Sequence, residues 1–237
     1  MILDVVTTSV PNPYKERRAL VHTALINDGE PVMIVTPTLE GLLGDKLTAC
    51  APLTVGVPIH SSIISGTDRT HNKHQQMIKQ LYDVNVLIPL ANDWSVVGSA
   101  FARTLDVQRD VFGQTFRDEE VVMDLTDRAL AMFGQLDREY HPDLYLAHQG
   151  GHRSLSNYIV DRSSFEYVDV KMAALRSAEI GQCITYGRTP IKVFKDITES
   201  TLGKERIKTI CKGLPKTVKR EAVTLVEALV NERSTSE

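Results

Sequence analysis

Short apolar runs rich in Val, Ile and Leu alternate along the chain with segments whose apolar residues recur every three or four positions. Runs of the first kind predict strands and segments of the second kind predict helices. In the first part of the chain, strands are predicted at residues 2–8, 31–36, 53–59 and 84–90. Helices are predicted at residues 14–27 and 72–82. This alternation of strands and helices is typical of α/β proteins.

A helical pattern then covers residues 94–140, with a break near residues 113–118. Its second half carries one apolar stripe, which we expect to pack on a sheet; the stripe consists of Val122, Leu125, Ala129 and Phe133. Further strands are predicted at residues 143–147, 157–162, 165–172 and 190–197, and further helices at 173–186, 201–211 and 216–232. The pattern as a whole predicts an α/β fold with a mixed central sheet flanked by helices. The pattern also predicts a division of the chain into two parts. Residues 1–92 form an α/β unit of unassigned role, and residues 93–237 form the second part.

The composition predicts a globular cytoplasmic protein. Apolar residues make up 42% of the chain and charged residues 24%, and no run approaches the roughly 18 consecutive apolar residues of a membrane helix. The first residues lack the basic and apolar regions of a secretory signal. Cys50, Cys183 and Cys211 are odd in number and widely spaced, so they predict neither a disulfide framework nor a paired zinc motif.

Charge is unevenly distributed along the chain. The net charge is −3, yet from Gly187 to the end eleven Lys or Arg stand against seven Asp or Glu, so this part carries +4 and the rest −7. A basic segment of this kind is typical either of a surface that contacts phosphates or of an ordinary solvated helical face.

One group of residues in the second half suggests catalysis. On a predicted strand, Asp169 and Lys171 project to the same face because side chains alternate with period two. If the strand that begins at Asp143 is a neighbour, the two carboxylates could converge on Mg²⁺ or Mn²⁺. Such a metal would polarise a phosphate, and Lys171 would stabilise the developing charge. These are the components of phosphodiester hydrolysis.

The same residues resemble motifs of the PD-(D/E)XK nuclease superfamily over roughly residues 118–198. In that family a Pro-Asp pair precedes an acidic-x-Lys strand, as Pro142-Asp143 and Asp169-Val170-Lys171 do here. The RecB-like branch adds Gln-x-x-x-Tyr on the following helix, which Gln182 and Tyr186 reproduce.

The resemblance implies a restriction-endonuclease-like second half that cleaves DNA or RNA with Mg²⁺ or Mn²⁺. It implies Asp143 and Asp169 as metal ligands and Lys171 as the catalytic lysine. Gln182 and Tyr186 would orient the substrate and the lysine. Glu120 is the candidate for the acidic residue that the family often supplies from the helix before the sheet.

Two other classes of function stay open. The loops predicted at residues 65–70 and 149–154 could hold a phosphate in a doubly wound α/β protein that binds or processes a nucleotide, nucleoside or sugar. A strand at 157–162 would favour the nuclease, whereas a helix there would favour the nucleotide-binding fold. The third possibility is a non-catalytic module that binds nucleic acid or protein through its basic C-terminal helices.

Overall fold

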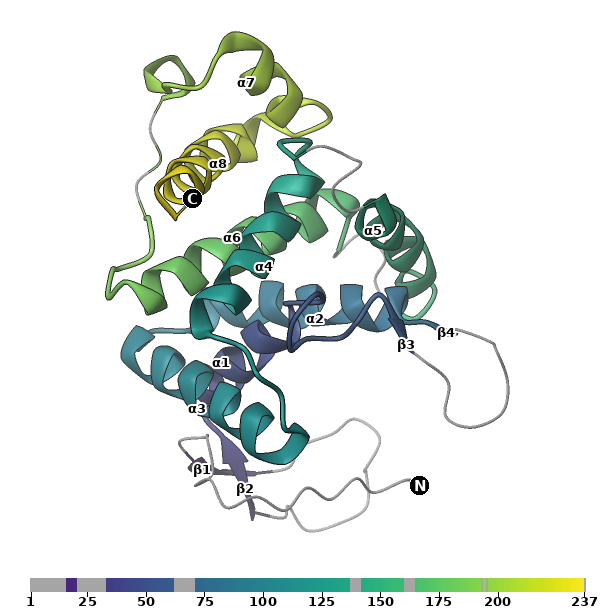
Figure 1. Ribbon diagram of the computed structural model, residues 1–237, viewed down its shortest axis with the longest axis vertical. Coiled ribbons are helices and arrows are strands. Elements are labelled where there is room, and N and C mark those ends of the chain that lie inside the picture. The colour runs from purple at the N-terminus through teal and green to yellow at the C-terminus, as the bar shows by residue number, and fades with distance from the viewer. Residues whose placement is uncertain are drawn as a thin grey trace.

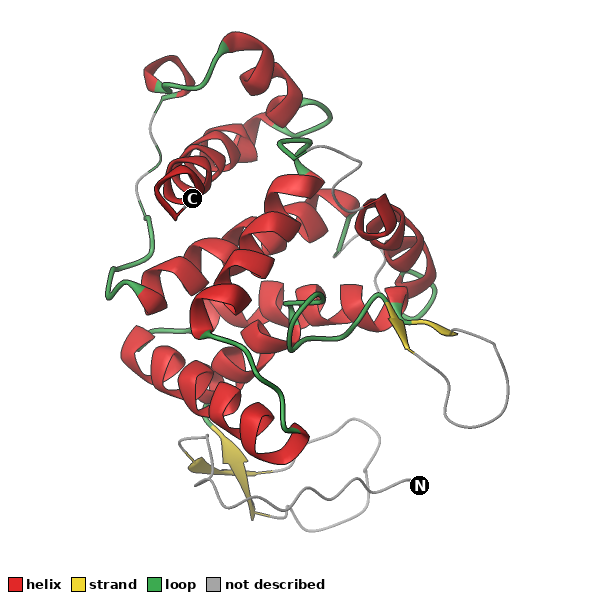
Figure 2. Ribbon diagram, in the orientation of Figure 1, coloured by secondary structure: helices red, strands yellow, loops and turns green. Residues whose placement is uncertain are grey.

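The computed structural model describes residues 16–20, 33–61, 71–136, 142–159, 165–192, 194 and 196–236, and helices dominate this part of the chain (Figures 1 and 2). The strands are β1 (Glu16–Leu20), β2 (Met33–Pro37), β3 (His60–Ser61) and β4 (His71–Asn72). The helices of the first half are α1 (Leu39–Ala49), α2 (His74–Leu87), the short 3₁₀ helix η1 (Ile88–Leu90), α3 (Trp94–Phe112) and α4 (Asp118–Met132). Those of the second half are α5 (Pro142–Leu155), α6 (Tyr167–Thr185), the short 3₁₀ helix η3 (Ile197–Glu199), α7 (Lys204–Cys211) and α8 (Lys216–Ser236).

The predicted α/β fold is wrong for the described residues. Their strands form two separate antiparallel pairs, β1 with β2 and β3 with β4, instead of one central mixed sheet. The restriction-endonuclease-like arrangement expected for the second half is therefore also wrong, because the described part of that half contains helices and connecting segments. The doubly wound alternative is contradicted for the same reason.

Two predicted strands are helical because their apolar residues satisfy a helical period as well as an alternating one. Residues 143–147 belong to α5, whose buried residues Leu144, Ala147 and Gly151 are spaced as on one face of a helix. Residues 165–172 lead into α6, whose first turn is closed by reciprocal hydrogen bonds between Glu166 and Asp169. Short apolar runs cannot be assigned from alternation alone.

The remaining predicted elements have mixed outcomes. Residues 84–90 form the end of α2 and η1 instead of a strand, whereas most of 14–27 lies outside the described residues and Glu16–Leu20 is a strand instead of a helix. Residues 53–59, 157–159 and the described part of 190–197 are not strands. The predicted type is confirmed for one strand, near residues 31–36, and for four helices, near 72–82, 173–186, 201–211 and 216–232. The helical region that begins at residue 94, with its break near 113–118, is also confirmed. The strand predicted at residues 2–8 lies outside the described residues.

The core is built from helix pairs. Helix α1 packs on α3, α2 on α5, and α4 on α6, and one hydrophobic cluster includes side chains from both sides of residue 92. The predicted stripe on α4 is buried, and it faces α6 instead of a sheet: Val122 and Leu125 lie against Gly181. The division into residues 1–92 and 93–237 stays a prediction.

Two glycines allow helices to cross closely. A Cβ atom at Gly44 of α1 would lie 2.5 Å from the carbonyl oxygen of Val97 on α3. At Gly151 of α5 it would lie 2.3 Å from the carbonyl oxygen of His74 on α2. The Gly-rich segment at residues 149–154, considered as a loop that could hold a phosphate, is instead helical and Gly151 lies at a helix–helix crossing.

A buried arginine joins three helices and the end of a fourth. Arg128 of α4 donates hydrogen bonds to the carbonyl oxygens of Cys50 (2.6 Å) and Met77 (3.2 Å) and to Nε2 of His148 (3.0 Å). His148 accepts through Nε2, and burial lowers its pKa well below the ordinary value, so its ring is neutral. One turn earlier, Asp124 accepts from the backbone N–H of Leu53. These contacts secure the segment after α1 to α4.

No helix in the described part of the chain combines the length and the apolar character required to cross a membrane.

Candidate nucleic-acid interface

Helices α7 and α8 form a hairpin at one end of the molecule (Figure 1). Ile207 and Ile210 are three residues apart on α7 and face inward, Ile210 being fully buried. The chain then reverses at Gly213, whose φ of 73° is a left-handed conformation that favours glycine. Leu214 is buried beyond the turn, and Pro215 precedes the start of α8. The apolar anchors leave the charged residues of α7 on the outside.

The C-terminal two thirds of α8 hold the hairpin against the body. The apolar face of α8 packs on α6 and α4, and its fully buried residues include Ala222, Val226 and Leu229. At the start of this contact, Arg176 of α6 donates to Glu221 at 2.6 Å and 3.0 Å. The hairpin of α7 and α8 is therefore anchored to the body of the molecule through α8.

Three lysines converge on one open pocket of about 530 Å³ between the two helices. Lys208 lies on α7, and Lys212 is the C-cap residue that directly follows this helix. Lys219 contributes from α8. Thr209 and Cys211 complete the lining together with Glu205, the one acidic residue among the described residues of this pocket.

The charges around this pocket are strongly unbalanced. Residues 203–220 contain seven basic side chains and one acidic side chain, Glu205. Among the described residues, the ammonium of Lys208 forms an ion pair with the carboxylate of Glu205 at 3.9 Å. Lys212 and Lys219 have no carboxylate of a described residue within 4.0 Å. This surface, which consists of the basic residues of 203–220 and is called here the basic hairpin, can bind an anion with several phosphate groups.

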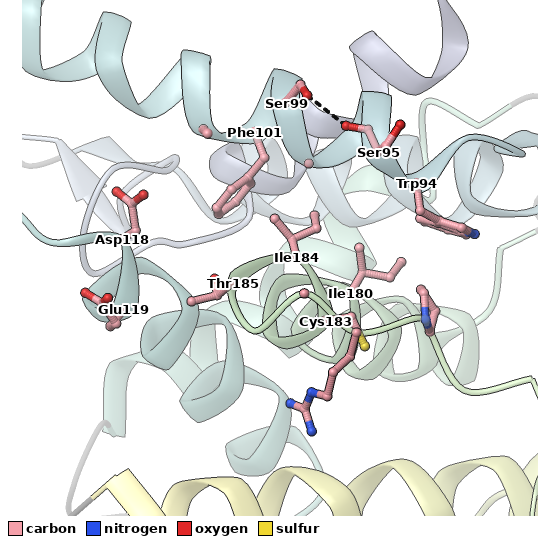
Figure 3. A pocket seen from close by; sticks show the side chains of 15 residues that line it. Trp94, Ser95, Ser99, Phe101, Asp118, Glu119, Ile180, Cys183, Ile184 and Thr185 are labelled. Carbon is pink, nitrogen blue, oxygen red and sulfur yellow. Dashed lines mark hydrogen bonds between the residues drawn. The ribbon is translucent and has the colours of Figure 1, made fainter.

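A larger hollow of about 640 Å³ lies between α3, the start of α4 and the end of α6 (Figure 3). Figure 3 shows Phe101 of α3 pointing toward α6, from which Ile180 and Ile184 point back, with Asp118 and Glu119 at one side. The carboxylate of Asp118 pairs with Arg109, and Arg109 does not line the hollow. The lining also includes Arg188, whose guanidinium pairs with the carboxylate of Glu232.

The thiol in this hollow is not activated. Cys183 is buried and donates to Oε1 of Glu179 at 3.4 Å. Burial, together with the Glu179 carboxylate, raises the pKa of the Cys183 thiol to about 12. A protonated thiol is a weak nucleophile. Oε1 of Glu179 also accepts from the backbone N–H of Ile191 at 2.6 Å, so this carboxylate stabilises the fold locally.

The three predicted acidic residues lie on three different helices. Asp143, in the first turn of α5, is exposed, and its carboxylate lies 4.0 Å from Nε2 of His60. Asp169 accepts from the backbone N–H of Glu166 at 2.6 Å and caps α6. Glu120 is in the first turn of α4 and accepts from the backbone N–H of Arg117, which lowers its pKa.

The other three predicted residues also make separate contacts. Lys171 of α6 lies over the ring of Phe133, with its ammonium 4.2 Å from the ring centroid, and burial lowers its pKa. Gln182 is buried and donates to Oγ1 of Thr126 at 3.0 Å. Tyr186 is half exposed at the end of α6.

The expected grouping of these residues depended on a strand. Asp169 and Lys171 lie on a helix, where residues two apart do not share a face. The predicted Mg²⁺ or Mn²⁺ ligands, Asp143 and Asp169, have His60 and the α6 N-terminus as their respective neighbours, and a shared ion between them stays a prediction. In the described ranges, no cluster of three or more His, Cys, Asp or Glu side chains could hold a metal.

Sequence reasoning identified the basic C-terminal helices but missed the convergence of Lys219 with Lys208 and Lys212. Two signals were present: the spacing of four between the first two lysines, and the Gly213-Leu214-Pro215 turn that brings α8 back onto α7. Comparison with models of protein families, and searches among curated proteins and solved structures, found no match.

Proposed function

We propose that this chain binds nucleic acid through the phosphate backbone, using the basic hairpin, and that it acts as a binding module without cleaving the strand. The observation that carries the proposal is that Lys208, Lys212 and Lys219 line one open pocket that has a single carboxylate in its described lining.

The charge distribution supports a polyanion as the ligand. The chain as a whole is at −3, so it does not attract nucleic acid by its net charge, but residues 203–220 carry +6. Each lysine ammonium is a compact charge with three donors. Binding of several ammonium groups to neighbouring phosphates releases condensed counterions, which drives association without reading the base sequence.

The contacts of the predicted catalytic residues favour a non-catalytic module over a nuclease. Asp169 and Glu120 cap helices, and Lys171 packs on an aromatic ring. None of these three side chains lines the pocket of the basic hairpin. Nuclease activity stays a prediction, which the binding experiment below also tests.

The test is a salt titration of binding to fluorescent single-stranded RNA and DNA, followed by anisotropy. The variant replaces Lys208, Lys212 and Lys219 together with Gln, which keeps a flexible polar side chain and removes three charges. If each lysine neutralises one phosphate, the slope of log K against log salt should become shallower by about 2. The same three contacts correspond to a loss of affinity on the order of 50-fold at about 0.15 M salt.

A matched control variant replaces three exposed basic residues elsewhere, Arg103, Arg153 and Lys192, with Gln. It changes the net charge by the same amount and should retain most of the affinity and the salt slope. Equal losses in the two variants, or no binding by the unaltered chain, would refute the proposal. Gel analysis of the strand after incubation with Mg²⁺ or Mn²⁺ should show it intact, and cleavage would support the nuclease prediction instead.

A further inference from the structure

The beginning of α8 differs from the rest of this helix in its exposure. Lys216, Thr217 and Arg220 are exposed, whereas residues 222–227 are all buried where α8 packs on α6 and α4. The ion pair between Glu221 and Arg176 lies at the boundary between the two parts. One helix therefore anchors itself to the body with its later turns and presents its first turns at the surface.

A short turn connects these exposed turns to α7. Four residues, 212–215, join the two helices at the top of the molecule (Figure 1). They include Gly213 in its left-handed conformation and the buried Leu214. Two packed helices with a glycine-containing turn of three or four residues are typical of helix-turn-helix modules, whose second helix enters the major groove of DNA. The lengths and the turn of α7 and α8 agree with this arrangement.

The side chains of the basic hairpin favour a duplex over a single strand. Sites for single strands stack the bases on aromatic side chains. Residues 203–220 contain no Phe, Tyr or Trp. From Arg206 to Arg220 they also contain no acidic residue, so the surface offers cations for phosphates and no platform for unpaired bases.

We propose that the nucleic acid bound by the basic hairpin is duplex DNA and that the first turns of α8 enter its major groove; this inference rests on the proposed function and specifies its ligand. An α-helix about 10–12 Å across fits the major groove of B-DNA, which is about 12 Å wide. The major groove of duplex RNA is too deep and narrow for side chains to read.

The residues divide the work by their position. Thr217, the second residue of α8, brings a hydroxyl and a methyl group that can contact base edges in the groove. Lys208, Lys212 and Lys219, which line one pocket beside it, supply ammonium groups for the phosphates that border the groove. Phosphate contacts then provide most of the affinity, and α8 provides the preference for the B-form duplex.

The first test compares duplex DNA, single-stranded DNA and duplex RNA of one sequence and length in anisotropy titrations at one salt concentration. We expect duplex DNA to bind at least about tenfold more tightly than each of the other two. A preference of less than about tenfold over either of them would overturn this inference and leave the proposed function standing. Absence of binding to all three would refute the proposed function, and this inference with it.

A second experiment identifies the groove by disulfide trapping. In a Cys211→Ser background the other native cysteines, Cys50 and Cys183, are buried, so Thr217→Cys supplies an accessible thiol at an exposed site. One DNA duplex carries a thiol tether, as a mixed disulfide, on N4 of cytosine in the major groove, and another carries it on N2 of guanine in the minor groove.

Thr217→Cys should exchange into a covalent complex with the cytosine tether and give little product with the guanine tether. The matched control is Ser99→Cys, at an exposed position of α3, which should give little product with both. Trapping on guanine that equals or exceeds trapping on cytosine, or a yield on cytosine no higher than that of the control, would overturn the placement of α8 in the major groove.

Discussion

Replacement of Asp124 by Asn should remove a pH dependence of stability that arises from one buried carboxyl group. Asp124 is 4% exposed. Its Oδ2 accepts from the backbone N–H of Leu53 at 2.7 Å and from Oγ1 of Thr54 at 2.9 Å, whereas Oδ1 has no hydrogen-bond partner among the described residues. Asn preserves the size of the side chain and an oxygen acceptor for Leu53 and Thr54, so the substitution isolates the charge.

The magnitude follows from the pKa of the carboxyl group. Burial raises the pKa of Asp124 from 3.8 to about 6, although the hydrogen bonds from Thr54 and Leu53 and the charge of Arg128 oppose the shift. The folded state therefore binds this proton more tightly than the unfolded state. Binding of this proton stabilises the folded state fully below pH 3.8, and the stabilisation is lost as pH rises through 6. The free energy of unfolding, relative to that of the variant, should rise by about 2 kcal/mol from pH 7 to pH 4 and by about 3 kcal/mol in the acid limit.

The assay is urea unfolding of the unaltered chain and of Asp124→Asn at several pH values between 4 and 7, followed by circular dichroism. The difference between the two is the informative quantity, because other groups titrate in both. His148, whose pKa burial lowers well below its ordinary value, weakens the fold as pH falls through 6.5 and cancels in the difference. Asp106→Asn, which removes an exposed carboxylate, corrects for the loss of one negative charge. The reasoning would be refuted if the difference in free energy of unfolding between the two proteins did not change with pH, or if it decreased as the pH was lowered.

Two further predictions concern packing, and both can be measured by urea unfolding. Gly44→Ala should lower the free energy of unfolding by about 1–3 kcal/mol, because its Cβ would meet the α3 backbone at 2.5 Å. Gly150→Ala is the control, because Gly150 also lies inside a helix but its nearest contact is at an ordinary 3.5 Å; equal effects would contradict the close crossing. Arg128→Met should cost about 3–5 kcal/mol by leaving two buried carbonyl oxygens and a buried ring nitrogen without their donor. Arg103→Met changes an exposed arginine and should cost much less; a loss under about 1 kcal/mol for Arg128→Met would show that the network contributes little.

Several helices could be predicted from sequence because their signals are local and agree with one another. The apolar residues of 94–112 keep a helical period, and Gly113 ends the helix in a left-handed conformation. The same holds for α8, whose period continues over 21 residues. In long segments of this kind, the period distinguishes a helix from a strand without knowledge of neighbours.

The errors arose where the local signal was short and ambiguous. The segment 165–172 alternates apolar and polar residues, but Asp169 caps a helix and Val170 belongs to the buried face of α6. Once this segment was read as a strand, Asp169 and Lys171 were placed on one face and a metal site followed. The predicted site was therefore a consequence of the wrong element and not an independent observation.

The sequence alone determined which side chains were available: a concentration of lysines near residues 203–220, an uncharged apolar strand at β2, and amphipathic helices separated by glycine and proline. Tertiary structure decided how they are used. It brought Lys219 to Lys208 and Lys212, placed Gly151 at a helix crossing, and gave Asp124 a buried site with a raised pKa. The physical reason is that periodicity and capping act over a few residues, whereas proximity and desolvation depend on how whole helices pack.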